Sequence, residues 1–329
     1  MLSAVSRRGL CNAARPLSVG LLGLPMSKGQ KKAGTELAPA ELRKRGLIES
    51  LEATIQGPMH DFGDVDFRPC GEYDGARYMA ASARLIRQTV AKCLDECQRL
   101  VTLGGDHSVA MGTVAGHADH ARANGRELAV IWIDAHSDIN TPKTSPSGSW
   151  HGMPVAMCLH EMMALMPPMK EFEGWVTPLD AASIAYIGLR DVDSSERYFL
   201  DKLRIVNFTM RDLDAYGINK VAEMALDKVD PHGHRSIHVS FDVDGLDPSV
   251  APSTGTPVAA GMTLREAAVV CETIAASERL SVLDLVEINP LIGTPADVTT
   301  TMETATQVAR WLFGQRQAGG HVPADSPRL

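Results

Sequence analysis

Short apolar runs alternate along the chain with longer amphipathic stretches from residue 17 onward. The apolar runs predict β-strands over residues 19–24, 100–103, 129–133, 184–189, 204–208, 237–241 and 282–288. Apolar residues three or four apart predict helices over residues 80–100, 217–229 and 263–277, and Thr263 with Glu266 has the order of a capping box. Strands that alternate with helices in this way predict an α/β fold, with a parallel sheet covered by helices on both faces.

The chain shows no internal repeat, linker or low-complexity block, so one domain over residues 17–321 is the simplest organisation. Six basic residues and no acidic residue lie among its first 35 residues. Acid-poor N-termini that carry arginine are typical of mitochondrial transit peptides. We therefore interpret residues 1–16 as a presequence for the mitochondrial matrix, with a cytoplasmic protein whose tail is charged by chance as the alternative. Residues 322–329 form a C-terminal tail in this interpretation.

Composition excludes several classes of protein. A hydrophobic content of 44% argues against disorder, and no apolar run approaches the roughly 18 residues of a membrane-spanning helix. There are 32 Lys and Arg against 40 Asp and Glu, so the formal net charge is −8 and the charge pattern of a nucleic-acid-binding protein is missing. Six cysteines without CxxC spacing argue against a disulfide framework or a thiolate zinc site, and they favour a reducing compartment.

Acidic and histidine side chains follow three of the predicted strands, those that end at residues 103, 133 and 241. Side chains two apart on an extended backbone point to the same side, and the carboxyl ends of parallel strands meet at one crevice. We therefore expect four carboxylates and two imidazoles to converge there. The six residues are His107, Asp134, His136, Asp138, Asp242 and Asp244.

So many acids in one poorly solvated crevice would repel one another unless cations were bound among them. Six ligands exceed what one ion takes and suit two ions that share aspartate oxygens. Oxygen and imidazole donors without thiolate favour a harder ion such as manganese over structural zinc. Two close ions lower the pKa of a bridging water and deliver hydroxide at neutral pH, so the predicted chemistry is hydrolysis.

The remaining candidates have simpler interpretations. GGDH does not match the dinucleotide fingerprint and residues 23–28 do not match the phosphate-binding loop, so nucleotide binding is not expected. His117 and His120 are interpreted as packing or surface residues of a helix. Cys93 and Cys97, four apart on another predicted helix, are interpreted as core residues.

Eight motifs, taken as a set, carry a resemblance to a known family. They are SKGQ (27–30), GGDHS (104–108), DAHSDINTP (134–142), SGSWHG (147–152), IGLRDVD (187–193), SFDVDGLDP (240–248), TGTPV (254–258) and VEINP (286–290). On these motifs the chain resembles the arginase/agmatinase (ureohydrolase) family, and within it the arginases, most closely the mitochondrial type of animals. The resemblance implies a three-layer αβα sandwich with a mainly parallel eight-stranded sheet, as in the arginase/deacetylase-like fold.

The resemblance also implies two Mn²⁺ per subunit, held by the same six residues that spacing selects. Asp134 and Asp242 would bridge the two ions. His107 and Asp138 would complete the first site, and the remaining two ligands would complete the second.

By the same resemblance, a hydroxide that bridges the metals attacks the guanidinium carbon of L-arginine and yields L-ornithine and urea. Asp138 would orient that hydroxide, and His151 would carry protons. A histidine in a loop suits proton exchange with solvent. Glu287, assisted by Thr256, would bind the guanidinium group, because a carboxylate matches its planar fork.

The amino-acid end of the substrate distinguishes arginine from agmatine, which has no α-carboxylate. The resemblance implies that Asn140 and Ser147 contact the carboxylate, that Asp193 contacts the α-amino group, and that Glu196 assists through water. Ser149 stands where arginases usually have asparagine. Since serine is shorter, carboxylate recognition is predicted to be weaker or water-mediated, unless a nearby shift compensates.

Two alternatives stay open at this point. One is a ureohydrolase of another guanidino compound such as agmatine, which Ser149 favours. The other is a non-catalytic relative that acts as a scaffold, which the intact ligand set disfavours. The resemblance further implies a homotrimer, although the C-terminal stretch 314–321 departs from the tail that animal arginases use for assembly.

Overall fold

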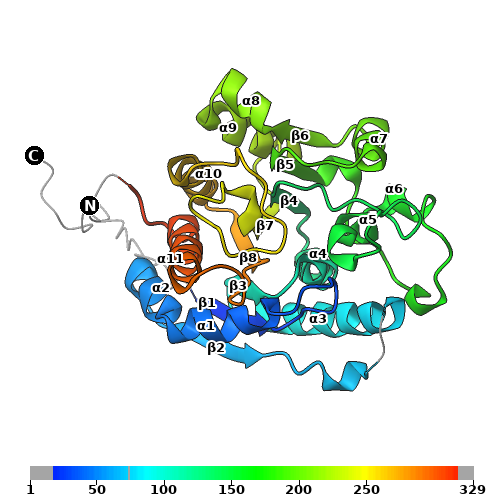
Figure 1. The fold of residues 1–329 in the computed structure, drawn as a ribbon, viewed down its shortest axis with the longest axis horizontal. Coiled ribbons are helices and arrows are strands. Elements are labelled where there is room, and N and C mark those ends of the chain that lie inside the picture. Colours follow the sequence, from blue (N-terminus) through cyan, green and yellow to red (C-terminus); the bar gives the residue numbers. More distant parts are fainter. Residues whose placement is uncertain (1–17, 73–74, 318–329) are drawn as a thin grey trace, which may run out of the picture.

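The computed structural model describes residues 18–72 and 75–317, so the predicted presequence and the tail 322–329 lie outside the described residues. Within this part of the chain, eight strands form one sheet in the order β2-β1-β3-β8-β7-β4-β5-β6, and all neighbouring pairs are parallel (Figure 1). The strands are β1 (Val19–Leu24), β2 (Met59–Asp64), β3 (Arg99–Gly104), β4 (Leu128–Ile133), β5 (Ile184–Leu189), β6 (Val206–Thr209), β7 (Ser236–Asp242) and β8 (Leu280–Val286).

Helices cover both faces of the sheet, which makes three layers (Figure 1). One face packs against α1 (Ala38–Lys44), α2 (Leu47–Ile55), α8 (Met210–Tyr216), α9 (Ile218–Val229), α10 (Leu264–Ala276) and α11 (Pro295–Leu312). The other face packs against α3 (Ala76–Glu96), α4 (Ala110–Ala123), α5 (Pro154–Cys158), α6 (His160–Met163) and α7 (Ser194–Leu203). The α/β class and the layered parallel sheet that the sequence predicts are confirmed.

Burial on both faces explains why the strands could be recognised. Every residue of β1, β4, β5 and β7 is buried, and continuous apolar runs are typical of parallel strands covered on both sides. Cys93 and Cys97 are buried core residues, as expected. Among the described helices, none combines the length and the apolar character needed to cross a membrane.

Several predicted boundaries need correction. The helix predicted over 80–100 is α3, which starts at Ala76 and ends at Glu96, because Arg99 and Leu100 belong to β3. The strand predicted over 204–208 begins at Val206, since Arg204 ends α7 in a left-handed conformation. Strand β2 was not predicted. It is an edge strand with the mostly polar sequence MHDFGD and half-exposed residues, so it has no apolar run.

The capping box predicted for the helix at 263–277 is present at the start of α10. Thr263 is the N-cap, its hydroxyl accepts from the Glu266 N–H, and the Glu266 carboxylate accepts from the Thr263 N–H. Both contacts satisfy N–H groups that have no partner within the helix, so this sequence signal defines the helix start.

The four central strands position the candidate site residues. β3, β8, β7 and β4 are neighbours in the sheet, and since all run in the same direction, their carboxyl ends meet at one edge. His107, Glu287, Asp242 and Asp134 lie at the ends of these four strands in that order. Ligand sites in open parallel sheets form at this edge, and this is where the predicted residues gather.

Candidate metal centre and substrate site

The first ligand candidate, His107, enters the site from the turn after β3. It opens a short 3₁₀-helix (His107–Val109) that leads into α4, and the Asp106 side chain caps this turn by accepting from the Ser108 N–H. Gly105 is required here, because a Cβ on it would lie 1.7 Å from the Met26 carbonyl oxygen. The His107 ring stacks on Trp132 with a centroid distance of 4.2 Å, and its Nε2 lies 2.8 Å from the Ser240 hydroxyl. The orientation of the His107 ring is therefore fixed by stacking on its face and by a polar contact at Nε2.

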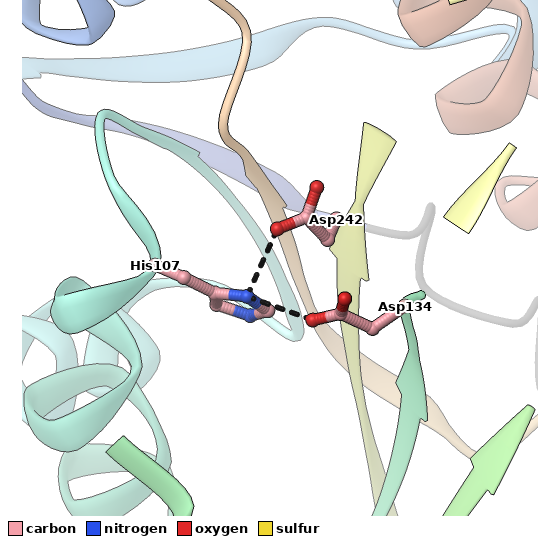
Figure 2. Close-up of side chains that lie close together, drawn as sticks. All are labelled: His107, Asp134 and Asp242. Atoms are coloured by element: carbon pink, nitrogen blue, oxygen red, sulfur yellow. Dashed lines mark ion pairs between the residues drawn. The ribbon is translucent and has the colours of Figure 1, made fainter. Parts of the chain in front are cut away.

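Three carboxylates surround the other nitrogen of this ring. His107 Nδ1 lies 3.2 Å from both Asp134 and Asp242 (Figure 2). It also lies 3.1 Å from Asp138. It is fully buried and has no hydrogen bond of acceptable geometry within the described structure. A buried nitrogen with three carboxylate oxygens around it and no hydrogen bond has the surroundings of a metal ligand.

A second group is formed by His136. Its Nδ1 lies 3.4 Å from Asp134 Oδ1 and 3.2 Å from Asp244 Oδ2, so Asp134 takes part in both groups. Together the six residues, which we call the metal cluster, are His107, Asp134, His136, Asp138, Asp242 and Asp244. The donors are carboxylate oxygens and imidazole nitrogens, which fit a divalent cation of intermediate hardness.

The cluster converges as predicted, but one of the two reasons given for it, the two-residue spacing on an extended backbone, is wrong. β4 ends at Ile133, so Asp134, His136 and Asp138 are not on an extended strand. Asp138 has a left-handed backbone with φ of 49°, and Asp244 lies in a 3₁₀-helix after β7. Compact turns, closed by bonds such as His136 N–H to Asp134, bring the side chains together.

The electrostatics of the cluster show how crowded its charges are. Burial and the neighbouring carboxylates raise the pKa of Asp242 well above its usual value, and burial with Asp134 raises the pKa of Asp138 to about 6. Burial disfavours a charged His107, but the carboxylates outweigh it and raise the His107 pKa well above the ordinary value. Four acids this close together need positive charge beside them, which protons or cations can supply.

Glu287 lies directly after β8 and is fully buried. Its backbone is left-handed, with φ of 64°, which turns the side chain away from the strand direction. Its Oε1 accepts from the His107 N–H at 2.8 Å and lies 3.0 Å from His151 Nδ1. Burial disfavours the charged carboxylate, but His151 and the other donors lower the Glu287 pKa, so a carboxylate is held ready beside the metal cluster.

His151 lies in a short 3₁₀-helix (Trp150–Gly152), and 19% of its side chain is exposed. Burial lowers its pKa, but Glu287 outweighs this effect and raises the His151 pKa to about 9. Since His136 in the cluster is also 22% exposed on its side chain, the site has contact with solvent at these two histidines.

The residues predicted for the amino-acid end lie on two neighbouring loops and in the first turn of α7. Asn140 donates to Asp193 at 2.8 Å, and Asp193 caps α7 in a box with Glu196. The buried Glu196 carboxylate accepts from the Ile139 N–H at 3.1 Å, which ties α7 to the loop of the metal cluster. Burial and the charge of Asp138 raise the pKa of Glu196 to about 7.

The other three predicted substrate contacts are Ser147, Ser149 and Thr256, and each is hydrogen-bonded to a residue of the site or its loops. Ser147 is exposed, and its hydroxyl accepts from the N–H of the buried Ser149 at 3.1 Å. Thr256 donates to Asp244 Oδ2 at 2.9 Å, so it lies beside the His136 group of the metal cluster.

Sequence reasoning missed several residues that shape the site. Trp132 donates to Asp134 at 3.0 Å and also stacks on His107. Ser240 contacts His107 and lies two residues before Asp242 on β7, so the period of a strand could have pointed to it. Gln30 donates to Glu287 at 2.7 Å; it belongs to the SKGQ motif (27–30), but 257 residues separate it from Glu287 and no role was assigned to it.

Comparison with known proteins decides the family. The sequence matches the Arginase family over residues 17–314. The chain belongs to the Arginase family. Its relatives include human mitochondrial arginase-2, with 42% identity over 94% of this chain and 88% of that protein, and human arginase-1, with 42% identity over 95% of this chain and 98% of that protein.

Solved structures agree with this assignment. The crystal structure of arginase from Bacillus subtilis has 32% identity and a TM-score of 0.79, over 91% of this chain and 99% of that one. The structure of Entamoeba histolytica arginase in complex with L-ornithine has 30% identity and a TM-score of 0.78, over 91% and 99% of the two chains. The fold and the His/Asp groups of this Arginase family member therefore point to a metal-binding hydrolase.

Proposed function

We propose that this protein is a manganese-dependent arginase that hydrolyses L-arginine to L-ornithine and urea. The observation that carries the proposal is the position of Glu287. A fully buried carboxylate, which suits a guanidinium group, accepts from the backbone N–H of the metal-cluster residue His107 at 2.8 Å. A guanidinium bound there would lie next to the metal cluster.

The metal cluster is proposed to hold two Mn²⁺ per subunit. Asp134 takes part in both His/Asp groups and is the natural bridging ligand, and we propose Asp242 as the second. When bound, two such ions supply an activated water at neutral pH. Two observations support this assignment. The buried His107 Nδ1 has no hydrogen bond within the described structure, and none of the six donors is a thiolate.

The chain's own residues then have distinct tasks. Glu287 binds the guanidinium, and Thr256 assists from its place beside Asp244. Asp138, the most exposed acid near His107 at 10% of its side chain, would accept a hydrogen bond from the attacking water and so orient it. As the bond from the guanidinium carbon to the ornithine nitrogen breaks, that nitrogen needs a proton, which His151 transfers from solvent.

Recognition of the amino-acid end is proposed for the pair of loops around Asn140 and Asp193. Asp193 provides a carboxylate for the α-amino group, and Glu196 holds it through the capping box of α7. Ser147 and Ser149 offer hydroxyl and backbone donors to the α-carboxylate, with Asn140 beside them.

The cellular context is part of the proposal. The acid-free first 35 residues support a presequence over 1–16 and the mitochondrial matrix, with the cytoplasm as alternative. We propose one catalytic domain over 17–321 and a homotrimer. Imaging of a fluorescent fusion tests the location, and light scattering of the purified protein tests the assembly.

Urea release from L-arginine and from agmatine, measured side by side with Mn²⁺ present, tests the function. The proposal predicts much faster turnover of L-arginine. Faster turnover of agmatine would identify the chain as a different ureohydrolase. No urea from either substrate, together with no bound manganese, would indicate a scaffold.

Ser149→Asn refines the substrate assignment. If Ser149 weakens carboxylate recognition, the longer asparagine lowers the KM for L-arginine by roughly fivefold and leaves agmatine turnover unchanged, since one added hydrogen bond contributes about 1 kcal/mol. An unchanged KM for L-arginine would mean that neighbouring groups already compensate for the serine.

A further inference from the structure

The segment 27–32, which we call the glutamine loop, is tied to several of the loops that build the site. The Gly29 N–H donates to Asp106 Oδ2 at 2.7 Å, beside His107. The His151 N–H donates to the Gly29 carbonyl at 3.1 Å. Lys32 donates to the Gly255 carbonyl in the loop that carries Thr256. The glutamine loop is therefore held in place by three separate parts of the site.

At the centre of this loop, Gln30 extends to the proposed guanidinium-binding carboxylate. Its Nε2 donates to Glu287 Oε2 at 2.7 Å. Gly255 leaves the space that this side chain needs, because a Cβ there would lie 2.9 Å from Gln30 Oε1 and 3.7 Å from Glu287 Oε2. The contact is thus built into the packing of two loops that are far apart in the sequence.

The acceptor positions on Glu287 show which donor can stay when a substrate binds. A carboxylate oxygen has two lone-pair positions. Oε1 is taken by the His107 N–H and by His151 Nδ1, whereas Gln30 is the one donor to Oε2 among the described residues, which leaves a second position on Oε2 open. A guanidinium fork needs one position on each oxygen. It therefore has to replace His151 on Oε1, and it can bind Oε2 while Gln30 remains.

We propose that Gln30 is a positioning residue for guanidinium recognition, which holds Glu287 Oε2 so that the open edge of the carboxylate faces the substrate. This inference rests on the proposed function and deepens it. Without the amide, nothing on the Oε2 side fixes the rotation of the carboxylate, so binding of the fork weakens while the reacting groups at the metal cluster stay in place.

Gln30→Met tests the inference, because methionine has a similar length and no N–H to donate. In the manganese-loaded protein we expect the KM for L-arginine to rise about tenfold, equivalent to about 1.4 kcal/mol. We expect kcat to stay within about threefold and the bound manganese to be unchanged. The inhibition constant of guanidinium chloride, used as a probe at millimolar concentrations, should rise by the same factor as KM.

Two further variants test whether the effect of Gln30→Met comes from the lost amide or from a general disturbance of the glutamine loop. Gln30→Asn keeps the amide but shortens it by one methylene, so its KM should lie between those of the wild type and Gln30→Met. Lys31→Met changes the exposed neighbour in the same loop and should leave KM, kcat and melting temperature unchanged.

Two other outcomes for Gln30→Met overturn the inference. A lower KM in Gln30→Met would mean that Gln30 competes with the substrate for Glu287. An unchanged KM with a lower melting temperature would mean that Gln30 only stabilises the loop. If the wild type releases no urea from L-arginine, the proposed function fails, and calorimetric binding of guanidinium ion to the manganese-loaded wild type and Gln30→Met still decides the role of Gln30.

Discussion

Two clusters of buried aspartate and histidine lie close together in this sheet, and they differ in how their charges are balanced. One is the metal cluster at the strand ends. The other, which we call the strand cluster, lies within the sheet around Asp284 of β8. Asp284 accepts from Thr102 at 2.6 Å and from Thr113 at 2.5 Å, and it lies 2.9 Å from His238 Nε2. His238 Nδ1 lies 3.2 Å from His117 Nδ1.

In the strand cluster one carboxylate has three partners. Burial disfavours its charge, but His238 and the two threonines outweigh this and lower the pKa of Asp284 below its usual value. In the metal cluster four carboxylates share two imidazoles, and the pKa of Asp242 is raised instead. Clusters built from the same residue types therefore differ in charge balance: the strand cluster is balanced and supports the fold, and we propose that the unbalanced metal cluster binds cations.

Removing a ligand from the metal cluster gives the largest expected effect. Asp242→Asn should reduce urea release roughly a thousandfold, because loss of the metals removes the activated water. The metal-free variant should be more stable than the metal-free wild type by about 1 kcal/mol, since one of the crowded charges is gone. Urea assays and denaturant unfolding in chelator measure the two effects. A stability loss in chelator would show that the metal cluster is balanced without cations.

An aspartate-to-asparagine substitution in the strand cluster should have the opposite effects, a loss of stability with metal binding retained. Asp284→Asn should lower the free energy of unfolding by about 3 kcal/mol, because it breaks a buried ionic network. The chelated protein is the right state for this measurement, and circular dichroism in urea provides it. Manganese-loaded Asp284→Asn that remains folded should bind two equivalents of metal. Loss of metal with unchanged stability would contradict the division of roles.

The pH dependence of stability gives a further test of the Asp284→Asn prediction. The Asp284 pKa is lower in the folded protein than its ordinary value of 3.8. Its contribution to stability is therefore complete above pH 3.8 and is lost as the pH falls through the folded-state pKa. The stability difference between the wild type and Asp284→Asn should be constant at neutral pH and should shrink in acid. A difference that grew on acidification would refute the lowered pKa.

Ser240 lies between the two clusters on β7 and offers the smallest expected effect. Its hydroxyl contacts His107 Nε2, whereas the other ring nitrogen, Nδ1, lies beside Asp134 in the metal cluster. Ser240→Ala should weaken manganese binding about tenfold, because partners of a ligating histidine fix its orientation. A metal-competition titration measures this. Unchanged affinity would mean that stacking on Trp132 is sufficient to orient the ring.

The comparison also shows what the sequence could and could not predict. Apolar runs identify seven of the strands, and the residues after them identify the metal cluster, because fold and ligand position follow from local patterns. Asp284 lies inside a strand that was interpreted as otherwise apolar, and only the contacts from β3 and α4 explain it. The left-handed turn at Glu287 and the approach of Gln30 depend on distant segments, so local sequence does not predict them.

A titration of the metal-free protein with Mn²⁺ tests whether the metal cluster is the catalytic centre, with bound metal and urea release from L-arginine measured on the same samples. We expect no activity in chelator and activity that rises until two Mn²⁺ are bound per chain. Asp242→Asn in the same titration should bind less metal and stay inactive. Full urea release in chelator, or undiminished metal binding by Asp242→Asn, would contradict the assignment of the unbalanced cluster as the catalytic metal centre.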